Sequence, residues 1–189
     1  FNIFIVDSPE VLSQYHFSDN IIQNNIAHGH ESYLGSIFCN EKIYSLRINN
    51  ISFINNTCDC LYGGGIGIEI KDLQSDLYFE NCMFLNNSAK QNKDFSRPTN
   101  NPDIKYYNGD GGAIQLGYIC WMNFIDIYFI KCTFKNNRAA RHGGAISIQT
   151  NQLVQILNCK FENNEANYNF DESSSELLID NYFHLKNEG

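Results

Sequence analysis

Large apolar residues recur along the chain, each followed by two adjacent asparagines at the second and third positions after it. These apolar anchors are Ile22, Phe53, Phe84, Phe134 and Phe161. They are 31, 31, 50 and 27 residues apart, so the pattern indicates repeats of about 30 residues with one insertion.

Each repeat predicts short β-strands, because its apolar positions alternate with a period of two. Apolar residues precede most anchors by two, five and seven positions, and the change of phase between them indicates a bend. A second alternating stretch follows a glycine pair at Gly64–Ile68, Gly111–Leu116 and Gly143–Ile148, with a weaker copy at Gly35–Cys39. In this alignment Cys39 matches Ile68. We therefore expect an all-β fold, a right-handed parallel β-helix of about five to six coils with three short strands per coil.

Such coils stack about 4.8 Å apart, so equivalent residues are expected to form columns. The expected inner columns are an aromatic one of Phe53, Phe84, Phe134 and Phe161, and a thiol one of Cys82, Cys132 and Cys159. The second asparagines of the pairs are Asn56, Asn87, Asn137 and Asn164. Asparagine tolerates the left-handed backbone of a tight turn, and stacked amides can form a ladder.

These motifs resemble a known repeat family. Gly-Gly-Ala-Ile stands at Gly111–Ile114 and Gly143–Ile146 and is relaxed at Gly63–Ile66, and Phe-x-x-Asn stands at Phe53, Phe84, Phe134 and Phe161. Their alternation over roughly residues 15–165 resembles the repeats of chlamydial polymorphic outer-membrane proteins and similar protist surface proteins. The asparagine- and isoleucine-rich composition favours a protist-type member. The resemblance implies an extracellular β-helical surface or adhesion protein.

We expect residues 1–189 to form a single β-helix domain. Residues 89–110 are expected to be a surface loop inserted in the third full coil, with Tyr106 and Tyr107 as candidate contact residues; a merely tolerated insertion is the alternative. Residues 166–176 are expected to be a polar loop before a last degenerate coil. Because no helix is predicted to seal the ends, end-to-end association is expected. The alternative is that Phe1–Val6 and the last coil cap the ends.

The charge and hydropathy patterns exclude some functions. The net charge is −8, which argues against a nucleic-acid partner. No apolar run is long enough to span a membrane. Since the chain begins at Phe1, we expect a processed or excised segment.

Three asparagines, Asn50, Asn55 and Asn86, begin N-x-[ST] sequons and are candidates for N-linked glycans. The alternative is an asparagine ladder without sugar. Cys58, Cys60 and Cys120 are expected in bends and are the candidate crosslinks, whereas the thiol column is expected to stay reduced and buried. The histidine and cysteine spacings predict no metal site, and no cofactor is expected.

The carboxylates Asp59, Asp72, Asp76 and Asp126 are not expected to form one column, which argues against an enzyme that needs paired carboxylates. We therefore expect no enzymatic activity. The expected function is an extracellular structural or surface protein that is glycosylated and associates end to end into a fibre or larger ectodomain. The alternative is an adhesin or carbohydrate-binding module, and the third candidate is a polysaccharide lyase or hydrolase.

Overall fold

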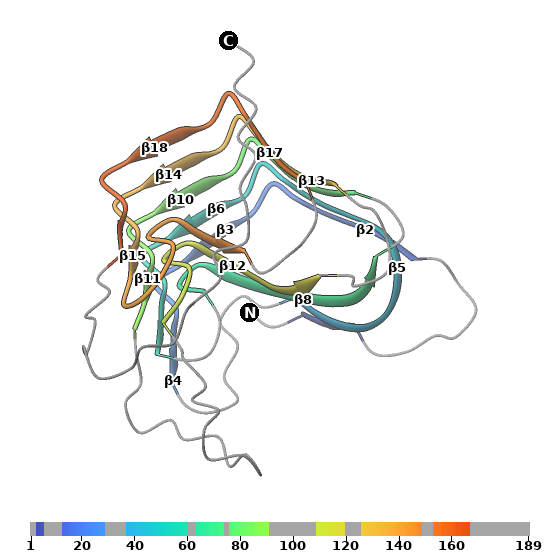
Figure 1. Cartoon of the computed structure of the whole chain (residues 1–189), viewed down its shortest axis with the longest axis horizontal. Coiled ribbons are helices and arrows are strands. Elements are labelled where there is room, and N and C mark those ends of the chain that lie inside the picture. Colours follow the sequence, from blue (N-terminus) through green and yellow to red (C-terminus); the bar gives the residue numbers. More distant parts are fainter. Residues whose placement is uncertain are drawn as a thin grey trace, which may run out of the picture.

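The computed structural model describes residues 3–5, 13–28, 37–59, 63–73, 76–90, 109–119, 126–148 and 153–166. These parts of the chain contain β-strands and no helix, and every strand pairing is parallel. Figure 1 shows the strands of successive coils stacked on one another. The chain is a parallel β-helix, as its sequence predicts.

The two smaller sheets contain five strands each. The first comprises β3 (Ile21–Gln23), β6 (Ser52–Ile54), β10 (Met83–Leu85), β14 (Thr133–Lys135) and β18 (Lys160–Glu162). The second comprises β4 (Ile26–His28), β7 (Thr57–Asp59), β11 (Ser88–Ala89), β15 (Arg138–Ala139) and β19 (Glu165–Ala166). We number the coils 1 to 5 in this order, so that coil 1 contains β3 and β4 and coil 5 contains β18 and β19.

The third sheet has nine strands and covers two faces of the helix, because one long strand takes part in both. Its strands are β1 (Ile3–Ile5), β2 (Ser13–Ser18), β5 (Ile37–Asn49), β8 (Ile66–Leu73), β9 (Leu77–Glu80), β12 (Ile114–Ile119), β13 (Asp126–Ile130), β16 (Ile146–Ile148) and β17 (Leu153–Leu157). The first part of β5 pairs with β1 and β8, and its last part pairs with β2 and β9. Each of these two faces is therefore also five strands deep.

The core lies between the faces and follows the predicted columns. Phe53, Phe84, Phe134 and Phe161 stack with ring centroids 4.8–4.9 Å apart and interplanar angles of 1–8°. The first three rings are buried, and Phe161 in coil 5 is 45% exposed. The aromatic column thus ends in a partly open ring face.

The register differs from the sequence prediction at Cys39. Ile37, not Cys39, pairs with Ile68, and Cys39 pairs with Ile70. The register of β5 against β8 shifts between Cys39 and Lys42. The predicted match assumed a spacing of 29 residues, whereas Ile37 and Ile68 keep the 31-residue spacing of the anchors Phe53 and Phe84.

Each coil turns at two left-handed residues around its middle strand. One stands three residues before the anchor (Asp19, Asn50, Asn81, Lys131 and Asn158), and the other is the first asparagine of each pair (Asn24, Asn55, Asn86, Asn136 and Asn163). All ten have φ between 52° and 57°, a region that asparagine and aspartate tolerate better than other residues with a Cβ. The third corner uses glycine: a Cβ on Gly111, at φ 67°, would lie 2.2 Å from Ile114 O.

Candidate functional site

The second asparagines of the pairs form a buried ladder that we call the inner asparagine ladder (Asn25, Asn56, Asn87, Asn137 and Asn164). The Nδ2 group of each of the first four donates to Oδ1 of the next coil's asparagine at 2.9–3.0 Å. The same Oδ1 atom also accepts the backbone N–H of the preceding asparagine at 3.0–3.2 Å. The second Nδ2 hydrogen reaches back to the anchor carbonyl of the preceding coil, as from Asn87 to Phe53 O at 2.9 Å. The ladder predicted from the sequence is therefore confirmed.

Asn56, Asn87 and Asn137 are fully buried, and each makes all four side-chain hydrogen bonds that an amide can make. Such satisfaction is needed because a buried amide group without a partner is destabilising. The ladder also has a direction, since every bond between two of its side chains runs from Nδ2 to Oδ1 of the next coil toward the C-terminal end.

The first asparagines of the pairs form a parallel, exposed series that we call the outer asparagine ladder. Here the direction is reversed: Asn86 Nδ2 donates to Asn55 Oδ1 at 3.1 Å, and Asn136 Nδ2 donates to Asn86 Oδ1 at 3.1 Å. The sequon residues Asn55 and Asn86 lie in this ladder with exposed side chains. Asn50 is exposed at the other corner and donates from Nδ2 to Asp19 Oδ1 at 2.6 Å, and this bond lowers the pKa of Asp19.

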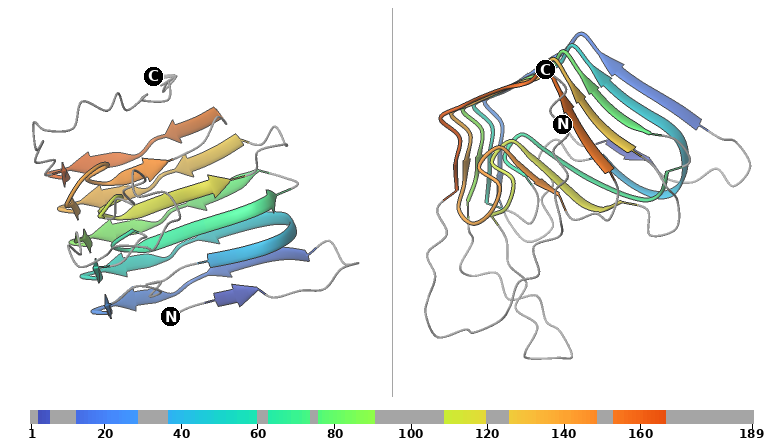
Figure 2. Two further views of the ribbon diagram at one scale, coloured as in Figure 1. Left: turned by 60° about the horizontal axis from the view of Figure 1, so that its bottom comes forward. Right: turned by 45° about the horizontal axis from the view of Figure 1, so that its top comes forward.

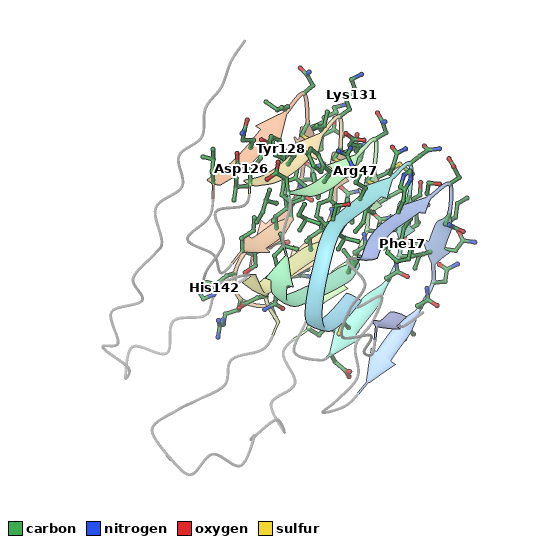
Figure 3. The ribbon with its side chains drawn as sticks, turned by 90° about the vertical axis from the view of Figure 1, so that its right-hand side faces the viewer. Phe17, Arg47, Asp126, Tyr128, Lys131 and His142 are labelled. Carbon is green, nitrogen blue, oxygen red and sulfur yellow. The ribbon has the colours of Figure 1, made fainter. Side chains whose placement is uncertain are left out.

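A second polar surface lies outside the sheet of β9 and β13, and we call it the Asp–Tyr face (Arg47, Asp76, Tyr78, Asp126 and Tyr128). The Tyr78 and Tyr128 rings stack at 4.8 Å, and the Arg47 guanidinium lies 4.1 Å from the Tyr78 centroid. Each tyrosine hydroxyl donates to the aspartate two residues before it, at 3.1 Å. Figure 3 shows Arg47, Asp126 and Tyr128 on one side of the molecule.

Burial, followed by the hydrogen bond to Asp126, raises the pKa of Tyr128 to about 12. Burial, followed by the bond to Asp76, also raises the pKa of Tyr78. Both tyrosines therefore stay neutral at physiological pH and act as hydrogen-bond donors. The face offers two carboxylates, two aromatic rings and one guanidinium along two columns.

Asp76 and Asp126 correct the expectation that the carboxylates share no column. They occupy the same position in coils 3 and 4, and Asp126 N donates to Asp76 Oδ1 at 2.9 Å. The signal was present in the sequence as a repeated Asp-x-Tyr, Asp76–Tyr78 and Asp126–Tyr128, eight and six residues before the anchors. It is easily missed because coil 2 has Arg47 and coil 5 has Gln155 at the tyrosine position.

The thiol column is present and reduced: Cys82, Cys132 and Cys159 are free, the first two buried and Cys159 half-buried. Cys132 N donates to Cys159 Sγ at 3.3 Å. Hydrogen bonding with the Cys132 side chain, more than the bond from Cys132 N, lowers the pKa of Cys159 to about 7, and hydrogen bonding with the Cys159 side chain raises the pKa of Cys132. Cys159 is therefore the most acidic thiol of the column.

Cys58 is disulfide-bonded, and its partner's side chain is not among those that the structure describes. The prediction that Cys58 lies in a bend is wrong, because it is the buried central residue of β7. The other crosslink candidates, Cys60 and Cys120, lie outside the described residues, as do Tyr106, Tyr107 and residues 167–176. Of the expected insertion at 89–110, Ala89 ends β11 and Asp110 is a buried partner of Arg141 at 2.8 Å.

Two further observations limit what the described residues can hold. They contain no group of three or more histidine, cysteine, aspartate or glutamate side chains arranged for a metal ion. They also contain no helix that is both long and apolar enough to cross a membrane.

Residues 131–149 match the model of the Chlamydia polymorphic membrane protein repeat, and this segment runs from the Lys131 corner through Phe134, Asn137 and the Gly143–Ile146 turn to just past β16. Searches of curated proteins and of solved structures found no match. The matched segment contains both motifs whose repetition builds the coils. The chain is thus a parallel β-helix built of stacked repeats, one stretch of which is similar to the Chlamydia polymorphic membrane protein repeat.

Proposed function

We propose that this chain is an extracellular surface protein whose β-helix acts as a stiff, glycosylated rod that associates end to end into a fibre or a larger ectodomain. The observation that carries the proposal is the five-coil parallel stack in which residues 131–149 match the Chlamydia polymorphic membrane protein repeat. The matched family is described as a membrane protein repeat, which supports a place at the cell surface.

The sequon positions support glycosylation. Asn50, Asn55 and Asn86 are exposed at corners, where an attached sugar meets no core residue. N-glycosylation leaves one hydrogen on Nδ2, so the outer asparagine ladder can keep its bond beside a glycan. Asn55 and Asn86 lie in adjacent coils about 4.8 Å apart, which crowds two glycans.

The test labels the surface of intact cells with a biotin reagent that does not cross membranes, and then isolates the biotinylated native proteins. We expect the chain in the biotinylated fraction, with a mass that falls after glycosidase treatment and peptides that carry a deamidated Asn50, Asn55 or Asn86. An unmodified chain found only inside the cell would contradict the proposal.

A second candidate function, a carbohydrate-binding adhesin, is supported by the Asp–Tyr face. Partly exposed tyrosines and carboxylates and an exposed guanidinium in a row suit a polysaccharide that lies along the helix. We infer binding without catalysis, because each carboxylate already accepts a tyrosine hydroxyl. On a glycan array, an Asp126→Asn and Tyr128→Phe double variant should lose binding that Met83→Gln, a change on another face, retains. Equal binding by both variants would exclude this face.

A further inference from the structure

The two end coils of the rod carry opposite halves of one hydrogen-bond pattern. In coils 2 to 4 each inner asparagine uses Oδ1 to accept from the preceding coil and Nδ2 to donate to the next one. The end coils lack one neighbour, so their asparagines can complete only part of this set. What each end lacks identifies the surface that it fits.

Coil 5 presents donors. Asn164 accepts both bonds from Asn137 and donates to Phe134 O, but its backbone N–H and its second Nδ2 hydrogen meet no acceptor among the described residues. Backbone groups of coil 5 are open in the same direction. In the inner coils, the atoms equivalent to Asn163 N and Asn164 O bond to the following coil. Asn136 N, for example, donates to Glu162 O at 2.9 Å.

Coil 1 presents the complementary groups. Asn25 donates to Asn56 Oδ1 through N and Nδ2, but no donor among the described residues reaches its own Oδ1. The N–H donors of Ile21 and Ile26 also meet no acceptor among the described residues, whereas the equivalent Ser52 N and Thr57 N bond to Asn20 O and Asn25 O at 3.0 and 2.9 Å.

We propose that copies of this chain stack head to tail, with Asn164 of one copy donating to Asn25 Oδ1 of the next. This deepens the end-to-end association of the proposed function by naming both surfaces and their polarity. Two C-terminal ends cannot pair in this way, because their ladders would place donor against donor.

The remaining contacts at this junction are compatible. The open ring face of Phe161 meets the half-buried Ile22, and Ile156 meets Phe17, so both core columns continue. No like charges oppose each other at the smaller sheets: Lys160 meets Ile21, Glu162 meets Gln23, and Glu165 meets Ile26.

No face of the helix has an extra strand at either end, because each face is five strands deep. Figure 2 shows the coils stacked in one direction, with coil 1 and coil 5 at opposite ends. A contact between two different surfaces does not close on itself, so it produces a filament. Five coils at about 4.8 Å give an axial rise of about 24 Å per copy.

A disulfide trap tests the polarity. Glu165 and Ile26 would face each other across the junction at a Cα distance of about 4.8 Å, within the range that a disulfide allows. Under mild oxidation we expect a 1:1 mixture of Glu165→Cys and Ile26→Cys chains to give a covalent dimer joined at these two positions. Each variant alone should stay uncrosslinked at this site.

Sedimentation of the unmodified chain at several concentrations separates the two ideas. Association without the mixed disulfide, or dimers of Glu165→Cys alone, would overturn the head-to-tail junction and leave self-association standing. A monomer at every concentration would overturn both.

An edge-blocking variant gives an independent measurement. Ile21 is the first residue of β3 and 67% exposed, and its N–H has no acceptor among the described residues, so proline is expected to be tolerated there. We expect Ile21→Pro to abolish filaments. Its circular dichroism spectrum should stay like that of the unmodified chain, which would show that the fold is kept. Ile21→Ala keeps the N–H and should still assemble; assembly of Ile21→Pro equal to that of Ile21→Ala would contradict the junction.

Discussion

Asn137 Oδ1 accepts two hydrogen bonds from Asn87, one from the backbone N–H and one from Nδ2, both at 3.0 Å. Both residues are fully buried. One oxygen thus satisfies a backbone donor at a left-handed corner and a side-chain donor in the core. The relationship couples each coil to the next at a point where the strands themselves are interrupted.

Replacing Asn137 with alanine should strongly destabilise the fold. It leaves two buried donors of Asn87 without acceptors, and each buried group left without a partner costs about 1–3 kcal/mol. We expect a loss of several kcal/mol in the free energy of unfolding, measured by urea denaturation. Asn136→Gly is the matched control, because it removes only the exposed amide and keeps φ 55°; its loss should stay below about 1 kcal/mol. Equal losses would contradict a special role for the inner asparagine ladder.

Lys131 is the least suitable residue at the left-handed corners, and its replacement by asparagine should stabilise the protein. It has φ 53° where coils 2, 3 and 5 have asparagine, and its side chain is exposed. A left-handed conformation costs about 1–2 kcal/mol for ordinary residues and less for asparagine. We expect Lys131→Asn to raise the free energy of unfolding by up to about 1 kcal/mol. Lys131→Ala retains the strain, so an equal gain from alanine would contradict this explanation.

Truncating the aromatic column should cost most in its middle. Phe84 is fully buried between Phe53 and Phe134, whereas Phe161 is 45% exposed. Phe84→Ala should therefore cost about 3–5 kcal/mol in chemical denaturation. Phe161→Ala should cost less than half of that. A larger loss at Phe161 would mean that the column is not the main source of core stability.

The sequence predicted the columns because every coil repeats the same anchor and the same asparagine pair. Stacking in register then places Phe84 on Phe53 and Asn87 on Asn56 without any knowledge of tertiary structure. The prediction fails where the local sequence gives no marker. The weak glycine copy misaligns Cys39 with Ile68, and Lys131 occupies a corner where the other coils have asparagine or aspartate.

The candidate site was less predictable than the fold. Asp76 and Asp126 are 50 residues apart because of the insertion, and only alignment on the anchors brings them to one column. Cys58 follows an Asn-Asn-Thr turn and looks like part of it, but the strand resumes at Thr57. The register between coils decides which surface side chains contact each other, and local secondary-structure propensity does not predict that register.

Cys159 should be the fastest of the three free thiols to react with iodoacetamide. Its pKa is lowered to about 7 by hydrogen bonding with the Cys132 side chain, and it is half-buried, whereas Cys82 and Cys132 are buried. We expect the alkylation rate to rise through pH 7 and then level off. The rate is measured by mass spectrometry of the modified peptide. In Cys132→Ser the rise should shift to a different pH. Faster labelling of Cys82 would contradict the order of the column.

Tyr128 should titrate at a higher pH than an ordinary tyrosine. It should therefore make the free energy of unfolding depend on pH in the alkaline range. Its pKa in the folded state is about 12, against 10.0 for an unperturbed phenol. Above pH 10 the unfolded chain loses this proton first, so the stabilisation is complete below pH 10 and is lost as the pH rises toward 12. A difference titration of phenolate absorbance between the unmodified chain and Tyr128→Phe should have its midpoint near 12. Asp126→Asn should lower the midpoint only in part, because burial is the larger cause. A midpoint at 10 would show that the Tyr128 hydroxyl is free in water and not bound to Asp126.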